Sequence, residues 1–270
     1  MKSNIKLALI AASALTLLAL PAQAHRAWLL PSATVLSGND LWVTVDAAIS
    51  NDLFYFEHHP MRLDGLAITT PDGSAAKAEN MATGRYRSTF DLKLDQPGTY
   101  KIAVLNQGAF ARYKLDGQDK RWRGSADEIA TKIPANATDV RITQSQGRIE
   151  TFVTTGKPTE AVFKTTGQGL ELVPVTHPNN LLAGEEAKFK LVLDGQPAAG
   201  LEVEVVPGGI RYRDQLNSIK VKTDESGTFA VKWPTPGMYW LSASVQDDKA
   251  TIKDARRRAS YTATVEVLPP

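Results

Sequence analysis

The chain contains four histidines and no cysteine, so imidazole nitrogens are its first candidates for metal binding or proton transfer. The absence of cysteine excludes disulfides, thiolate zinc sites, iron–sulfur ligation and cysteine nucleophiles. The sequence also lacks the nucleophile elbow of serine hydrolases, the zinc-protease helix motif and the glycine-rich phosphate loops. Metal coordination by nitrogen and oxygen is therefore the chemistry to consider first. The four candidates are His25, His58, His59 and His177.

His25 becomes the first residue of the protein if residues 1–24 are removed. Lys2 and Lys6 lead into an apolar run that ends in the small residues Ala22 and Ala24, the pattern of a cleaved secretory signal peptide. A terminal histidine offers both its α-amine, whose pKa is about 7.7–8.0, and a ring nitrogen to one metal ion. One further imidazole would complete a three-nitrogen set suited to Cu(II) or nickel. The alternative is that His25 is merely the residue after the cleavage point.

The segment 52–61 holds the second group of candidates. Interpreted as an extended strand, it places Glu57 and His59 on one face and His58 on the other. Glu57 and His59 would then offer an oxygen and a nitrogen ligand side by side, or one would orient the other. The alternative is a strand end whose imidazoles form hydrogen bonds with the backbone.

His177 precedes Pro178 in a segment that is first extended and then turns. It is either a structural residue at a domain junction or a metal ligand that faces a cleft from the second half of the chain. The structural interpretation is favoured, because a histidine, proline and asparagine in succession form a satisfactory turn by themselves.

The charge balance argues against a polyanionic partner. Residues 1–24 contain two of the 31 basic residues and none of the 29 acidic ones, so the remaining chain is balanced. Such a balance predicts no binding to nucleic acid or to an anionic membrane. The basic run 253–258 is interpreted as a solvated loop before the last strand. Export without cysteine favours a Gram-negative periplasm as the location.

The elements that position these residues are strands. With 270 residues the chain is long enough for two domains. Short segments with period-two patterning, such as 41–45, 66–70, 86–94 and 100–104, recur at the spacing of a β-sandwich. We therefore predict a signal peptide at 1–24, an N-terminal β-sandwich domain at 25–113, a connector at 114–166 and a C-terminal domain at 167–270.

The connector is mixed and polar. Ser125 and Glu128 form a capping box for one short helix over 125–133, which Pro134 ends. Two short strands, 148–153 and 161–164, are expected after it.

The C-terminal segment contains seven predicted strands in about 100 residues, the number found in an immunoglobulin-like sandwich. Turns are predicted at Asp194 with Gly195, at Ser226 with Gly227, and at Pro236. The predicted fold class is thus all-β, with two β-sandwich domains and an immunoglobulin-like C-terminal one.

Four blocks of sequence resemble the exported family called domain of unknown function 4198. They are 24–32, 156–159, 170–179 and 236–239, of which 170–179 is the most specific. The resemblance covers the whole chain after residue 24 and implies a two-domain β-sandwich protein that takes part in metal acquisition. Members of the family are associated with nickel or cobalt uptake. By motif position, His25 and His177 are the histidines that match.

Together these observations predict a periplasmic protein that binds a transition-metal ion or a metal chelate. Nickel, cobalt or copper is expected before iron, and a membrane transporter or outer-membrane receptor component is the expected partner. No catalytic residue is predicted. Two alternatives remain: a copper oxidative enzyme with an N-terminal histidine, and a metal-free adhesion or assembly module that binds partners by strand addition at a sheet edge.

Overall fold

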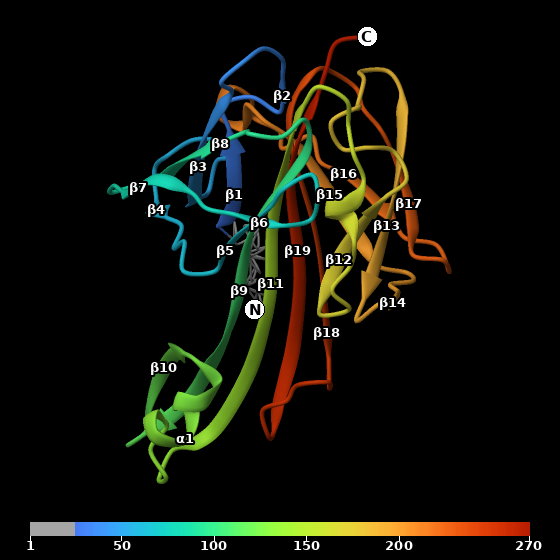
Figure 1. Ribbon diagram of the computed structural model, residues 1–270. Helices are drawn as coiled ribbons and strands as arrows, with labels where there is room; N and C mark the ends of the chain where they lie inside the picture. The colour runs from blue at the N-terminus through green and yellow to red at the C-terminus, as the bar shows by residue number, and fades with distance from the viewer. Residues whose placement is uncertain (1–24) are drawn as a thin grey trace, which may run out of the picture.

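The computed structural model describes residues 25–270, so the predicted signal peptide at 1–24 lies outside the described residues. The regular structure of the described chain consists mainly of strands in three sheets, shown in Figure 1. The N-terminal sheet has the order β1 (Arg26–Pro31), β3 (Trp42–Ser50), β8 (Ser88–Lys93) and β7 (Glu79–Thr83), and β4 (His59–Pro60) also pairs with β3.

The central sheet is the largest and receives strands from both halves of the chain. Its order is β16 (Ile219–Lys222), β15 (Glu202–Pro207), β18 (Gly237–Asp247), β19 (Ala255–Val267), β11 (Thr138–Thr155), β9 (Gly98–Leu115), β5 (Leu66–Thr69) and β6 (Ala75–Ala76). In addition, β10 (Gln118–Gly124) pairs with β9 and β2 (Val35–Leu36) pairs with β11. The C-terminal sheet contains β12 (Leu170–Pro174), β13 (Glu186–Leu193) and β14 (Gln196–Pro197), with β17 (Thr228–Lys232) beside β13.

The N-terminal and C-terminal sheets cover opposite faces of the central sheet, because alternate residues of a strand point to opposite sides. Ile102 and Val104 of β9 pack on Val45 and Phe90 of the N-terminal sheet. Residues of β18 and β19 pack instead on the C-terminal sheet, in a core that holds Phe189, Trp233 and Tyr261. A third, smaller apolar cluster joins the two halves. We call it the junction cluster: Trp28, Ala48, Leu53, Val206, Ile210 and Trp240.

Both sandwiches contain the same corner. The Tyr100 hydroxyl donates to the Gln96 carbonyl at 3.0 Å, and the Tyr239 hydroxyl donates to the Thr235 carbonyl at 2.8 Å. Each tyrosine follows a proline and a glycine, and each is almost fully buried. A tyrosine that bonds the backbone a few residues upstream is a feature of immunoglobulin-like sandwiches.

The arm is a part of the central sheet that projects beyond both sandwiches, at the bottom of Figure 1. We define it as the far ends of β9 and β11 with β10 and the short helix α1 (Ile129–Lys132). A 3₁₀ turn (Ala126–Glu128) precedes α1, and the predicted capping box between Ser125 and Glu128 is present. The arm is therefore a three-stranded ribbon in the order β10, β9, β11.

Two local predictions are wrong, and a third is correct in type but too short. Residues 161–164 do not form a strand: Ala161–Phe163 is a 3₁₀ turn, in which the Phe163 N–H donates to the Glu160 carbonyl at 3.0 Å. The basic run at 253–258 is a loop only at Lys253 and Asp254: β19 begins at Ala255, and Arg257 is 4% exposed. Residues 148–153 form a strand as predicted, but it is part of the much longer β11, which pairs with β9 on one side and β19 on the other.

The predicted fold class is confirmed: the chain is all-β, has β-sandwich architecture with an immunoglobulin-like C-terminal part, and contains one short α-helix among its described residues. The boundaries at 113/114 and 166/167 stay predictions. The helices within residues 25–270 include none with the length and apolar character needed to span a membrane.

Candidate functional site

Three of the four histidines lie together at one end of the N-terminal sheet. The ring centres of His25 and His58 are 3.9 Å apart, those of His58 and His59 are 4.5 Å apart, and those of His25 and His59 are 6.4 Å apart. His25 and His59 are exposed and His58 is half-buried. We call these residues the histidine cluster.

The end of β3 brings the cluster together. On one side β1 pairs with β3 so that Arg26 lies opposite Ser50, which places His25 just beyond this pair. On the other side β4 pairs with β3 so that His59 lies opposite Ile49. Residues more than thirty positions apart in the sequence therefore meet across the last residues of one strand.

The segment that carries His58 is a compact turn, so its interpretation as a strand over 52–61 is wrong. Phe54 has a φ of 61°, in the left-handed region, and the backbone N–H of Tyr55 donates to the Asp52 carbonyl at 3.3 Å. Only His59 and Pro60 are extended and paired. The alternation of aromatic residues that resembled a strand comes from side chains that pack from a turn.

Glu57 stabilises this turn. Its carboxylate accepts a hydrogen bond from the Ser50 hydroxyl at 3.2 Å and another from the Asp52 backbone N–H at 3.3 Å. Glu57 therefore does not lie beside His59 on a strand face, although its exposed carboxylate is only one residue from His58. Its role as a ligand stays a prediction.

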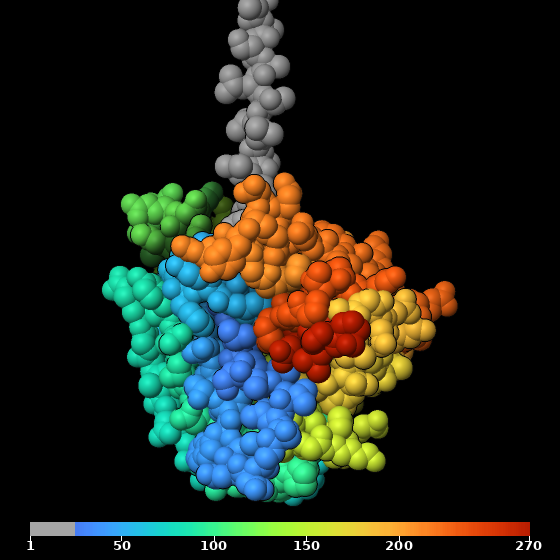
Figure 2. All heavy atoms as spheres, turned by 90° about the horizontal axis from the view of Figure 1, so that it is seen from above, coloured from blue at the N-terminus to red at the C-terminus, as the bar shows by residue number. Residues whose placement is uncertain are grey.

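Aromatic contacts fix the turn to the junction cluster. Phe54 packs edge-to-face on Trp28, with ring centres 5.8 Å apart, and Phe56 lies 6.4 Å from the same ring. From the second half of the chain, the Arg211 guanidinium lies 3.9 Å from the centre of the Tyr55 ring. Figure 2 shows these segments side by side, light blue near residue 55 and orange near residue 210. The histidine cluster thus lies on a turn that both halves of the chain position.

The histidine cluster supplies suitable donors in an arrangement that is not yet that of a bound metal. Within residues 25–270, no group of three or more His, Cys, Asp or Glu side chains is arranged to hold a metal ion. Imidazoles that share one tetrahedral ion, at about 2.0–2.1 Å from it, have ring centres about 5 Å apart. His25 would have to move about 1 Å away from His58 and about 1 Å towards His59, which rotations of exposed side chains can supply.

His177 lies apart from the cluster. Its Nδ1 accepts a hydrogen bond from the Asn179 backbone N–H at 3.1 Å, and its Nε2 lies 3.0 Å from the Thr99 hydroxyl. The only aromatic ring near it in the described structure is that of Phe163, at 5.3 Å. Burial lowers the pKa of His177, partly opposed by a backbone hydrogen bond with Thr159. Both ring nitrogens of His177 thus have a hydrogen-bond partner, in Thr99 and Asn179. The residue lines a cavity of about 460 Å³.

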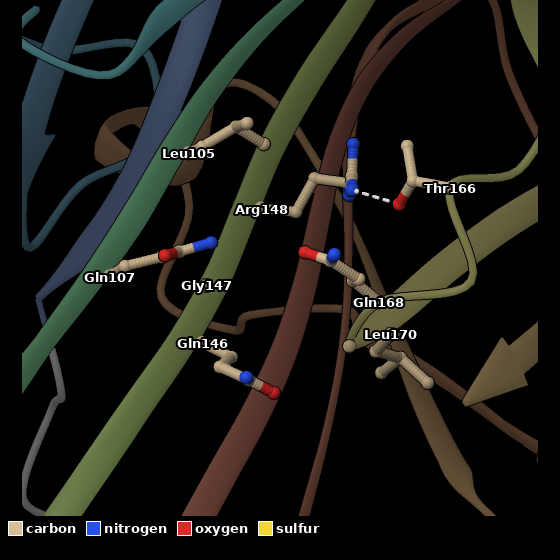
Figure 3. A pocket seen from close by; sticks show the side chains of 9 residues that line it. Leu105, Gln107, Gln146, Gly147, Arg148, Thr166, Gln168 and Leu170 are labelled. Carbon is tan, nitrogen blue, oxygen red and sulfur yellow. Dashed lines mark hydrogen bonds between the residues drawn. The ribbon is translucent and has the colours of Figure 1, made fainter. Parts of the chain in front are cut away.

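A second cavity, of about 280 Å³, lies between β9, β11 and the loop before β12, and sequence reasoning missed it (Figure 3). The Arg148 side chain is 11% exposed and lies 3.3 Å from both Glu150 and Glu171. Tyr261 donates to Glu150 at 2.8 Å, and burial is the first cause of the raised pKa of this tyrosine. These charged groups are satisfied by one another. The cavity is lined by Leu105, Gln107, Gln146, Gly147, Arg148, Thr166, Gln168, Gly169 and Leu170.

The fold and the cluster define a class: an all-β protein of immunoglobulin-like architecture with an exposed group of imidazoles. The chain belongs to the family described as "Domain of unknown function (DUF4198)", whose model matches residues 22–247. No curated protein sequence matches the chain.

Solved structures show weak similarity. A chain described as "Escherichia coli alpha-2-macroglobulin activated by porcine elastase" has a TM-score of 0.25 and 13% identity over 92% of this chain, which spans 20% of that chain. The "D0-D1 domain of Intimin" has a TM-score of 0.23 and 13% identity, with 89% of this chain and 97% of that chain covered. The ICAM-5 D1-D4 ectodomain fragment has a TM-score of 0.22 and 12% identity, with 90% and 51% covered.

Proposed function

We propose that this protein binds a transition-metal ion through His25, His58 and His59. The observation that supports the proposal is the convergence of three of only four histidines at the end of β3. Among the described residues, the hydrogen bonds of histidine rings are those of His177, so coordination by the other three histidines would not break a hydrogen bond. Three imidazoles without thiolate suit nickel, cobalt and copper.

We further propose that the protein is exported and that cleavage after Ala24 completes the site. The new α-amine of His25 would then add a fourth nitrogen next to the three rings. Because that amine titrates near neutral pH, a metal ion displaces its proton at small cost. An extra residue before His25 would convert the amine into an amide and remove this ligand.

The role that fits such a site is metal acquisition or homeostasis in the periplasm, with the ion passed to a membrane transporter or receptor component. The resemblance to a family associated with nickel and cobalt uptake supports this role. The exposure of His25 and His59 supports it as well, because a carrier must release its ion to a partner.

Isothermal titration with Cu(II), Ni(II) and Co(II) tests the proposal. Three forms of the protein are compared: one that starts at His25, one with a single glycine before His25, and a His58→Ala variant that starts at His25. The matched control is His177→Gln, because His177 lies outside the histidine cluster.

We expect one metal ion per chain in the form that starts at His25 and in the His177→Gln control. The glycine-extended form and His58→Ala should each bind at least tenfold more weakly. If all forms bind equally, or none binds, the site is not the one proposed. If the glycine-extended form binds as tightly as the form that starts at His25 while His58→Ala binds more weakly, the α-amine is not a ligand and the imidazole site stands.

A further inference from the structure

We infer that the arm binds an acidic peptide segment that adds to the free edge of β10. This inference is independent of the proposed metal site. Two separate observations carry it: a row of arginines across the ribbon, and the unpaired backbone of the strand on which that row ends.

The register of the strands places three arginines in one row. Arg121 of β10 lies opposite Arg112 of β9, and Arg112 lies opposite Arg141 of β11. Directly opposite residues of antiparallel strands have their side chains on the same face, about 5 Å apart. All three side chains are exposed. Like charges that are directly opposite destabilise a sheet, so this row has a cost that a bound anion would remove.

The next row on the same face extends the positive charge. In this row Arg123 of β10 lies opposite Phe110 of β9, and Phe110 lies opposite Thr143 of β11. Thr143 in turn pairs with Arg256 of β19. Arg256 lies 3.4 Å from the carboxylate of Asp248. Within residues 25–270, the four arginines of β9, β10 and the start of β11 form no salt bridge: Arg112, Arg121, Arg123 and Arg141. We call these four residues the arginine face.

The short helix of the arm covers the opposite face. A Cβ atom added to Gly124 would lie 2.5 Å from the Trp122 ring and 2.5 Å from the Glu128 carboxylate. Trp122 and the turn before α1 therefore lie on the side of the ribbon to which residues 122 and 124 point. Residues 121 and 123 point to the other side, so α1 leaves the arginine face uncovered.

The edge of β10 is also free. In the described structure β10 pairs only with β9, and its residues form no other backbone hydrogen bond. The connecting turn has two residues, Asp116 and Gly117, with φ of 51° and 75°. Such a turn makes the flanking residues, Leu115 and Gln118, a hydrogen-bonded pair. Hydrogen-bonded and non-hydrogen-bonded pairs alternate along antiparallel strands, so every second residue of β10 directs its N–H and C=O groups away from β9. These residues are Asp119, Arg121 and Arg123.

The unpaired backbone and the arginines therefore coincide at Arg121 and Arg123. A peptide strand added beside β10 would place two alternate side chains opposite these arginines, on the arginine face. Carboxylates are the complement of guanidinium groups, which they bind in a bidentate manner. The third alternate position would lie opposite Asp119, where an acidic residue is disfavoured. The expected ligand is thus an extended segment with acidic residues at positions i and i+2.

Fluorescence anisotropy of the full protein with synthetic peptides tests this inference. The probe is a labelled ten-residue peptide with two glutamates at i and i+2 among threonines and valines. One comparison peptide has the two glutamates adjacent, and another carries N-methyl groups on the alternate backbone nitrogens that would face β10. The variants are the triple change Arg112→Gln, Arg121→Gln, Arg141→Gln and the control Arg85→Gln, an exposed arginine far from the arm in the sequence.

We expect the alternating peptide to bind the wild-type protein and the Arg85→Gln control equally. The triple variant should bind it at least tenfold more weakly, and both comparison peptides should lose at least fivefold in affinity for the wild-type protein. Replacing both Arg121 and Arg123 by glutamate should transfer binding to a peptide with lysines in place of the glutamates. Equal binding of all acidic peptides would overturn strand addition. Arginine-dependent binding to phosphatidylglycerol vesicles without peptide binding would overturn the peptide as ligand.

Discussion

Arg257 connects the central sheet to the C-terminal sheet, and its removal should cost more stability than that of any exposed arginine. Its guanidinium donates to Asp247 of β18, with one contact at 2.9 Å, and to Asp194 at 3.0 and 2.8 Å. The Arg257 side chain is 5% exposed, whereas those of Asp194 and Asp247 are 28% and 22% exposed. The Arg257→Met change keeps the aliphatic volume and leaves two carboxylates without their cation.

Breaking a fully buried ion pair costs about 3–5 kcal/mol, because the remaining charge has no partner. Here water reaches both carboxylates, which reduces the expected loss to about 2–3 kcal/mol. The triple variant Arg257→Met, Asp194→Asn, Asp247→Asn has no stranded charge and should recover part of this loss. Urea unfolding at pH 7 measures all three free energies.

The loss should depend on pH in a defined direction. Hydrogen bonds from Arg257 are the first cause of the lowered pKa of both Asp194 and Asp247 in the folded protein. Their contribution to stability is complete above the unfolded pKa of about 3.9 and disappears as the pH falls through the folded values. The difference between wild type and Arg257→Met should therefore shrink below about pH 4. A loss under about 1 kcal/mol at pH 7, or the same loss at pH 3, would refute this account.

Further predictions concern single sites. Burial lowers the pKa of His177 in the folded protein, so the folded state loses stability as the pH drops through the unfolded pKa of about 6.5. His177→Gln removes this group and should make the free energy of unfolding fall less between pH 7.5 and 5. The same pH dependence in wild type and variant, measured by urea unfolding, would contradict this. Gly227→Ala should lower the free energy of unfolding by roughly 2–3 kcal/mol, since the φ of Gly227 is 80° and a Cβ would lie 2.4 Å from the Leu191 carbonyl oxygen. The control is Gly73→Ala, at a φ of 86° with no neighbour within 4 Å. It should lower the same free energy by about 1 kcal/mol, measured by urea unfolding. Arg112→Thr should raise the free energy of unfolding by about 0.2–1 kcal/mol; a loss would show that the arginine row is not repulsive.

The strands of the C-terminal half could be predicted because their turns carry local signals. Asp224 accepts hydrogen bonds from the backbone N–H groups of Ser226 and Thr228, and Gly227 occupies the left-handed region between β16 and β17. These contacts lie within five residues of sequence. The capping box of Ser125 and Glu128 was predictable for the same reason.

The extent of β11 could not be predicted in the same way. Residues 138–147 are mostly polar and none of them is fully buried, so apolar periodicity is weak. They are extended because β9 pairs with them over most of their length and β19 from Ile142 onward, contacts that no local pattern encodes. The burial of Arg257 has the same origin, since one of its partners is 63 residues away.

For the candidate metal site, the sequence indicated His25, His58 and His59 as candidate ligands but not the conformation of the backbone that carries His58. The pattern of aromatic residues at 54 and 56 indicated a strand, whereas both side chains pack on Trp28 from a turn. The arginine face could not be predicted from the net charge, because acidic residues elsewhere in the chain balance the basic residues that lie on one side of the arm. Only the register of three strands reveals the row.

The position of β19 has a consequence for how the chain matures. This strand lies between β18 and β11, and it joins positions as distant as Thr151 and Thr264, 113 residues apart. Until β19 docks on it, the free edge of β11 is an open template that another extended chain can pair with. A fold that depends on such distant pairing forms slowly. We therefore expect pairing between incompletely folded chains to compete with folding while the edge of β11 is open.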